Sequence, residues 1–217
     1  MSTTSIERPL VEICAPSVER AREAFALGAD RVELCRDIDC GGVTPTEDDL
    51  RQIPSLGGPV HVLIRCRAGN FVYTDEELQT MLSSIDRAAD CGAAGMVIGA
   101  LTAEGSIDIT TSKSLISKAR QRRLSVTYHR AIDEAADYFQ AYSDVCSLGV
   151  DRILTSGGMP TAWDGRFRLA TLIRRLEAAR PIILPGKGIT GENVRELVAV
   201  TGAKEIHGTR LEILKNL

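Results

Sequence analysis

The sequence of 217 residues has few aromatic side chains, no excess of positive charge and no long apolar run. Aromatic residues make up 4% of the chain, and 26 Lys and Arg face 29 Asp and Glu, a formal net charge of −3. Nucleic-acid binders usually carry a basic surface and aromatic side chains for base stacking, so this composition argues against one. No apolar stretch reaches the ~20 residues of a membrane-spanning helix, which argues against a membrane partner.

Several short signals are also missing. The segment MSTTSIERPL at the start lacks the basic and apolar regions of a secretory signal, so we expect the protein in the cytosol. The chain has no CxxC pair, no HExxH, no GxxxxGK[ST] loop and no GxSxG, which excludes the zinc-finger, metalloprotease, P-loop and nucleophile-elbow patterns. Six cysteines remain, and in the cytosol they are expected as thiols rather than disulfides.

A weak internal repeat is the most informative pattern in the chain. At four places a small-residue turn ending in Gly runs directly into a β-branched segment, as a helix end followed by a strand does. These segments are 26–35, 90–100, 147–158 and 200–210. Four further apolar runs, at 10–15, 59–66, 124–130 and 181–188, complete eight strand candidates.

Segments with helical spacing separate these strands. Ser17 is the expected N-cap of a helix over 17–28, and Thr74 with Glu77 forms a capping-box pattern at the start of 74–92. Further helices are expected over 111–123, 168–180 and 190–202.

This alternation of strand and helix predicts parallel strands joined by crossovers, and eight units fit one closed (β/α)8 TIM barrel. An open doubly wound sheet is the alternative, but it usually shows GxGxxG after the first strand, and none is present. We therefore expect a single α/β domain over 1–217. Its strands are expected near 10–15, 31–35, 60–66, 95–100, 125–130, 152–157, 181–186 and 205–209.

The barrel places function at the C-terminal ends of its strands. Alternation along a strand puts Glu12 on the same face as Cys14, and Glu33 on the same face as Cys35. The residues that alternate with them are apolar and are expected to pack against the outer helices. The side chains of Glu12, Cys14, Glu33 and Cys35 are therefore expected to point into the barrel. The same phase turns Arg65 inward on the third strand.

Cys14 and Cys35 lie on neighbouring strands, with Cα atoms ~5 Å apart if the two are in register. Two thiolates at this separation suit a Cu(I) ion. They are equally compatible with small buried side chains that fill a barrel layer, or with a redox disulfide. The spacing leaves these three alternatives open.

A second group of charged candidates comprises Glu12, Glu33, Arg65 and His129. As a catalytic set, a carboxylate or His129 would move a proton while Arg65 holds an anion. The alternative is a structural ion-pair network, because buried charges need partners. Arg67 and Arg130 add positive charge near the same rim, which suits a carboxylate or phosphate on a small ligand.

The PGKGIT segment follows the seventh strand, where barrels often bind phosphate. Gly186 and Lys187 are therefore candidate ligand-binding residues, together with His207 at the end of the eighth strand and Ser156 in the TSGG segment. The alternative is an ordinary glycine-rich turn at each place.

Taken in order, the strand ends resemble the CutC family of (β/α)8 barrels, which is associated with copper homeostasis. The resemblance runs through VEICAPSVERA, GADRVELC, GGVTPT, RCRAGNFVYTDEE, GMVIGALTAEGSID, VTYHRAIDE, DRILTSGG, PGKGIT and IHGTR. It implies a cytosolic copper-homeostasis protein, a homo-oligomer such as a dimer, with Cu(I) on Cys14 and Cys35. The chain departs from the family pattern at Cys66 and Asn70, and at Lys187 within the glycine-rich segment. The competing hypothesis from the residues is an enzyme that uses acid/base chemistry on a small anionic substrate at the C-terminal barrel face.

Overall fold

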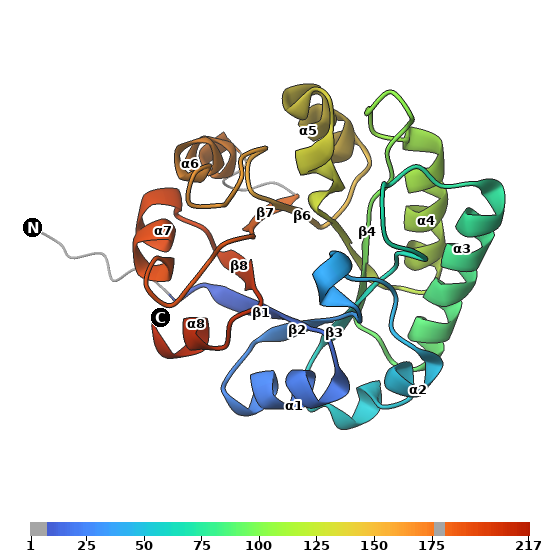
Figure 1. Ribbon diagram of the computed structural model, residues 1–217, viewed down its shortest axis with the longest axis horizontal. Coiled ribbons are helices and arrows are strands. Elements are labelled where there is room, and N and C mark those ends of the chain that lie inside the picture. Colours follow the sequence, from blue (N-terminus) through green and yellow to red (C-terminus); the bar gives the residue numbers. More distant parts are fainter. Residues whose placement is uncertain (1–7, 176–180) are drawn as a thin grey trace, which may run out of the picture.

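A computed structural model describes residues 8–175 and 181–217 as one barrel of eight parallel strands surrounded by helices (Figure 1). The strands are β1 (Leu10–Ala15), β2 (Arg31–Leu34), β3 (Val60–Leu63), β4 (Gly95–Ile98), β5 (Ser125–Tyr128), β6 (Arg152–Thr155), β7 (Ile182–Pro185) and β8 (Glu205–Gly208). The predicted single-domain (β/α)8 fold is confirmed.

Backbone pairing runs without interruption from β7 through β1 to β8. Within the described residues β7 and β8 are in contact but form no ladder, so the ring closes by packing at this point. Each strand begins within one residue of its predicted start, but seven of the eight end earlier than predicted. Arg65, His129 and Ser156 therefore lie just beyond their strands, in the segments that build the C-terminal face.

Eight α-helices surround the strands in the described part of the chain. They are α1 (Val18–Ala26), α2 (Glu47–Leu50), α3 (Asp75–Asp90), α4 (Ile109–Gln121), α5 (Tyr138–Ser147), α6 (Arg166–Arg175), α7 (Val194–Thr201) and α8 (Glu212–Lys215). The hydroxyl of Ser17 caps α1, and Thr74 with Glu77 forms the predicted capping box of α3. The predicted helix 168–180 corresponds to α6, and its last part, 176–180, lies outside the described residues.

The two faces of each strand differ in chemistry, as the alternation predicts. Outward side chains such as Val11, Ile13, Val32 and Leu34 are fully buried and pack with the helices into one large apolar core. Inward side chains form a small second apolar group, Cys14, Cys35, Leu63 and Val97, and a larger set of charged groups. The barrel interior is therefore mainly polar, which is where its chemistry lies.

The sequence repeat has a structural counterpart at the N-terminal end of the barrel. In each repeat the third residue after the glycine of the turn begins a strand, and these residues are Arg31, Gly95, Arg152 and Glu205. They come from β2, β4, β6 and β8, the alternate strands that supply one layer of a TIM barrel. Gly95 leaves room for the His61 ring, because a Cβ there would lie 2.6 Å from that ring.

Across residues 8–175 and 181–217, every helix is too short or too polar to span a lipid bilayer.

Candidate active site and metal centre

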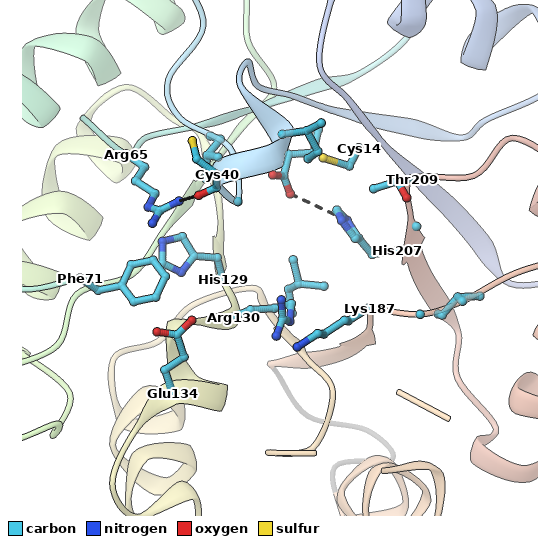
Figure 2. A pocket seen from close by; sticks show the side chains of 18 of the residues that line it. Cys14, Cys40, Arg65, Phe71, His129, Arg130, Glu134, Lys187, His207 and Thr209 are labelled. Carbon is cyan, nitrogen blue, oxygen red and sulfur yellow. Dashed lines mark hydrogen bonds and ion pairs between the residues drawn. The ribbon is translucent and has the colours of Figure 1, made fainter. Parts of the chain in front are cut away.

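A cavity of about 530 Å³ opens at the C-terminal face of the barrel, where a site is expected (Figure 2). Its inner end is made by the buried side chains of Cys14, Glu33 and His207. The exposed rim includes Lys187 and Glu134. Further lining residues are Ile38, Cys40, Gly41, Leu63, Arg65, Gly69, Phe71, His129, Arg130, Leu154, Gly188, Ile189, Gly208 and Thr209.

The structure brings the two predicted thiols together. The Sγ atoms of Cys14 and Cys35 lie 3.6 Å apart, and both side chains are buried. The residue directly opposite Cys14 on β2 is Glu33, so the assumption that the two cysteines are in register is wrong. Their hydrogen bond raises the pKa of Cys14, which burial raises further, and lowers the pKa of Cys35. Cys14 reaches the cavity, whereas Cys35 lies behind it.

Glu12 and His207 face each other across neighbouring strands. They are direct partners in the β1–β8 register, and His207 Nδ1 lies 2.8 Å from Glu12 Oε1. The same nitrogen lies 3.8 Å from Glu33 Oε2. Glu33 Oε2 is buried and has no hydrogen-bond partner among the described residues. One imidazole nitrogen thus stands between two carboxylates.

The three groups shift one another's protonation. Burial opposes the charge of Glu12, but Arg31 and His207 hold the pKa of Glu12 far below its usual range. Burial raises the pKa of Glu33 to about 8, and the nearby Glu12 carboxylate contributes to the rise. Burial disfavours a charged His207, yet its hydrogen bond to Glu12 and the charge of Glu33 raise the pKa of His207. Two carboxylates with opposite shifts are typical of sites that transfer protons.

A layer of ion pairs lies beneath this cluster. Arg31 bonds both Glu12 and Glu205, at 2.7 Å for the latter, and Arg152 Nε reaches Glu205 Oε2 at 2.6 Å. His61 lies beside this layer, with Nδ1 3.6 Å from Glu12 Oε2, and burial lowers the pKa of His61 to about 4. Of the four residues predicted as a possible ion-pair network, only Glu12 belongs to this layer, while Glu33, Arg65 and His129 stay outside it.

Arg65 and His129 line the opposite wall. Arg65 donates to the backbone oxygens of Cys40, Gly42 and Gly69 at 2.6–3.1 Å, and its guanidinium lies over the Phe71 ring. Most donors of Arg65 thus hold two loops in place. The Nδ1 atom of His129 accepts a bond from the Ala131 amide, which leaves Nε2 buried without a partner. Burial lowers the pKa of His129 to about 3, so its ring is neutral.

Two cationic side chains point into the cavity nearer its mouth, Arg130 and Lys187 (Figure 2). Arg130 uses Nε to bond Asp133 at 3.2 Å, and its terminal nitrogens have no other partner in the described chain. Lys187 has no ion-pair partner there either. Its φ of 79° is a left-handed conformation that costs a non-glycine residue ~1–2 kcal/mol. A strained residue at a ligand cavity is often kept for its function.

Three predicted ligand-binding residues do not line the cavity. Arg67 pairs with Glu77 and donates to the Val72 carbonyl at 2.6 Å, which fixes the segment before α3. Ser156 is buried and donates to the Met159 carbonyl at 2.5 Å. A Cβ on Gly186 would lie 2.4 Å from the Leu154 side chain, so this glycine is required by close packing.

Sequence reasoning missed the residues that complete the charge cluster, Arg31, Arg152 and Glu205. The repeat contained a signal for them, because Gly-Ala-Asp-Arg, Gly-Val-Asp-Arg and Gly-Ala-Lys-Glu place all three at the same position of a repeat. Their charges alone did not show that they converge inside a closed ring.

Comparison with known proteins agrees with this architecture. The model of the CutC family matches residues 9–212. A CutC family protein of Parabacteroides distasonis (strain ATCC 8503) is 41% identical over 94% of this chain and 84% of its own length. One from Aliivibrio fischeri (strain MJ11) is 39% identical over 91% of this chain and 80% of its own length.

Solved structures include a similar barrel. A protein from Streptococcus agalactiae, described as a candidate copper homeostasis protein CutC, has a TM-score of 0.85 and 30% identity. The match covers 94% of this chain and 100% of that one. On the family model, the identity over most of the chain and the shared barrel, the chain belongs to the CutC family.

Proposed function

We propose that the cavity binds a small anionic substrate, a carboxylate or phosphate, and transforms it by proton transfer at its inner end. The observation that carries this proposal is a set of three buried atoms on cavity-lining residues that have no partner among the described residues, Glu33 Oε2, His129 Nε2 and Arg65 Nε. An unsatisfied buried polar atom costs ~1–3 kcal/mol. Such a cost is understandable where a ligand supplies the missing partner.

The residues divide into two roles. Lys187 and Arg130 stand near the mouth, where their charges would hold the anion. Glu33 lies deeper, where it would accept or donate the proton, and Glu12 would orient His207 beside it. The Nε2–H of His129 would donate a hydrogen bond to the substrate. Arg65 would contribute its charge to the field while it holds the two loops.

Isothermal titration calorimetry with inorganic phosphate and with malonate tests the binding step. Lys187→Gln should weaken binding of the preferred anion about tenfold, which is ~1.4 kcal/mol. The matched control is Lys113→Gln, on the exposed side of α4, which should bind as the wild type does. Equal affinity in both variants, or no binding of either anion to the wild type, would contradict the proposal.

A second candidate function is Cu(I) binding by Cys14 and Cys35, as expected for a copper-homeostasis protein. Its specific support is the 3.6 Å between the two sulfurs, with Cys14 reaching the cavity. With the ~2.3 Å of a zinc–thiolate bond as a guide, one ion can join sulfurs up to ~4.6 Å apart, so the pair fits. Soft thiolates are the ligands that Cu(I) prefers.

An anaerobic Cu(I) titration against a chromophoric chelator tests this second candidate. The Cys14→Ser/Cys35→Ser variant should lose tight one-to-one binding, while Cys146→Ser, far from the cavity lining, should keep it. If the double variant competes for copper as well as the wild type does, the two thiols are packing residues.

The proposal also includes a cellular compartment and an oligomeric state. All six cysteines are free thiols, which favours the reducing cytosol. The family resemblance favours a homodimer, which light scattering during size-exclusion chromatography would detect as twice the mass of one chain.

A further inference from the structure

Three donor atoms converge at and just behind the inner end of the cavity, which Glu33 and His207 line and Glu12 does not. One carboxylate oxygen each of Glu12 and Glu33 and one imidazole nitrogen of His207 all lie within 4.8 Å of one another. All three side chains are buried. They come from β1, β2 and β8, which are adjacent strands of the ring, so the backbone holds their relative positions.

The geometry shows that this group lacks a component. Glu33 is 5% exposed, yet its Oε2 has no hydrogen-bond partner in the described residues and faces His207. Arg31 and Arg152 are paired with Glu12 and Glu205, which leaves Glu33 outside this layer of ion pairs. A buried carboxyl group requires a counter-ion or a proton.

We propose that Glu12, Glu33 and His207 form a binding site for a divalent cation, with Zn²⁺ as the best match to their donor atoms. Imidazole and carboxylate ligands bind zinc at ~2.0–2.2 Å, so two donors on one ion lie up to ~4.3 Å apart. The separations of 2.8 and 3.8 Å from His207 Nδ1 fall within this reach. The cation replaces the proton that His207 otherwise supplies to the carboxylates.

The site differs from the pair of cysteines, Cys14 and Cys35, because its ligand atoms are oxygen and nitrogen rather than sulfur and because its proposed role is catalytic. Three protein donors leave the side toward the cavity open, which is the arrangement of catalytic rather than structural zinc. The catalytic use rests on the proposed function: the open position faces the space in which the anion lies, and a bound cation polarises an oxygen placed there. Glu33 and His207 then serve as ligands, and the Nε2–H of His129 remains to donate a hydrogen bond to that oxygen.

Calorimetric titration of the chelator-treated chain with Zn²⁺ alone tests the site. The wild type should bind one ion per chain, and both Glu33→Gln and His207→Asn should weaken binding at least tenfold. Glu134→Gln is the matched control, because it removes a carboxylate from the rim of the same cavity, outside the three donors. Circular dichroism of each variant confirms that it is folded.

The thiols are tested in the same series. If Cys14→Ser/Cys35→Ser keeps the zinc ion, the ion is bound by the proposed donors. If that variant loses zinc while Glu33→Gln keeps it, the sulfurs bind the ion and the proposal is wrong, as it also is if the wild type binds none.

Phosphate and malonate titrations of the zinc-free and zinc-loaded chain separate this inference from the proposed function. Anion binding to a chain that takes no zinc overturns the metal site and leaves the proposed function standing. Zinc binding without any anion binding keeps the metal site and removes the proposed function.

Discussion

The barrel interior contains two polar regions that differ in how completely their charges are paired. In the lower region, Glu12, Arg31, Arg152 and Glu205 form a connected set in which every charge has an opposite partner. Around the cavity, Glu33 and His129 keep unpartnered atoms, and Lys187 has no counter-ion in the described chain. On the proposed function, the paired region supports the fold, while a ligand would supply partners to the unpaired atoms around the cavity.

The largest effect is expected from substitution of Arg31, whose guanidinium joins two carboxylates of the paired region. Arg31→Met leaves Glu12 and Glu205 buried without the guanidinium that joins them. Loss of one partner of a buried ion pair typically costs ~3–5 kcal/mol, so the free energy of unfolding should fall by about that amount. Urea denaturation monitored by circular dichroism measures it.

Two further variants provide reference values for the loss of unfolding free energy in Arg31→Met. Arg8→Met breaks a pair with Asp30 in which both side chains are partly exposed, and it should cost about 1 kcal/mol or less. Glu33→Gln removes an unpaired carboxyl and should cost far less than Arg31→Met. A loss below ~1 kcal/mol in Arg31→Met would mean that the paired region does not support the fold.

The next effect concerns pH and the neutral histidine of the cavity wall. The pKa of His129 is about 3 in the folded chain against an ordinary value near 6.5, because burial disfavours its charge. Between these values the unfolded chain binds more protons, so His129 makes stability fall as the pH drops, by up to ~1.4 kcal/mol per pH unit. His129→Asn should therefore lose less stability than the wild type between pH 7 and pH 4. Parallel curves in urea denaturation would show that this ring is not held neutral by burial.

The smallest expected effect distinguishes the backbone strain of Lys187 from the contribution of its side chain to anion binding. Lys187→Gly relieves the left-handed backbone and should raise the free energy of unfolding by about 1 kcal/mol, while the affinity for phosphate falls. Arg123→Gly is the matched control, since Arg123 has a φ of 58° away from the cavity. It should gain similar stability in thermal denaturation with no change in anion affinity. If Lys187→Gly is less stable than the wild type, packing of the lysine side chain outweighs the strain of its backbone.

Much of the fold could be predicted because its signals are local. Ser17 and Thr74 cap their helices as expected, since a cap depends on residues within one turn. The alternation on β1 and β2 correctly turned Glu12 and Glu33 inward. Helix α5 was not predicted, because its sequence YFQAYSDVCS is rich in aromatic and serine residues with modest helix propensity. Its start depends on Asp137, which accepts two backbone N–H groups.

The site was harder to predict because its contacts join distant parts of the chain. Glu12 and His207 are 195 residues apart and meet only when the last strand pairs with the first. Alternation shows that a side chain points inward, but not which groups across the ring it meets. Arg65 was expected to hold an anion, and nothing in its sequence surroundings indicates that its donors bind three loop carbonyls.

The paired charges below the cavity also determine how a bound species travels. Glu12, Arg31 and Glu205 are at most 6% exposed and occupy the barrel interior, so they form a floor under the cavity. On the proposed function, a ligand would enter and leave through the same mouth of the cavity. Delivery and release would then both take place at the rim that bears the exposed residues Lys187 and Thr209.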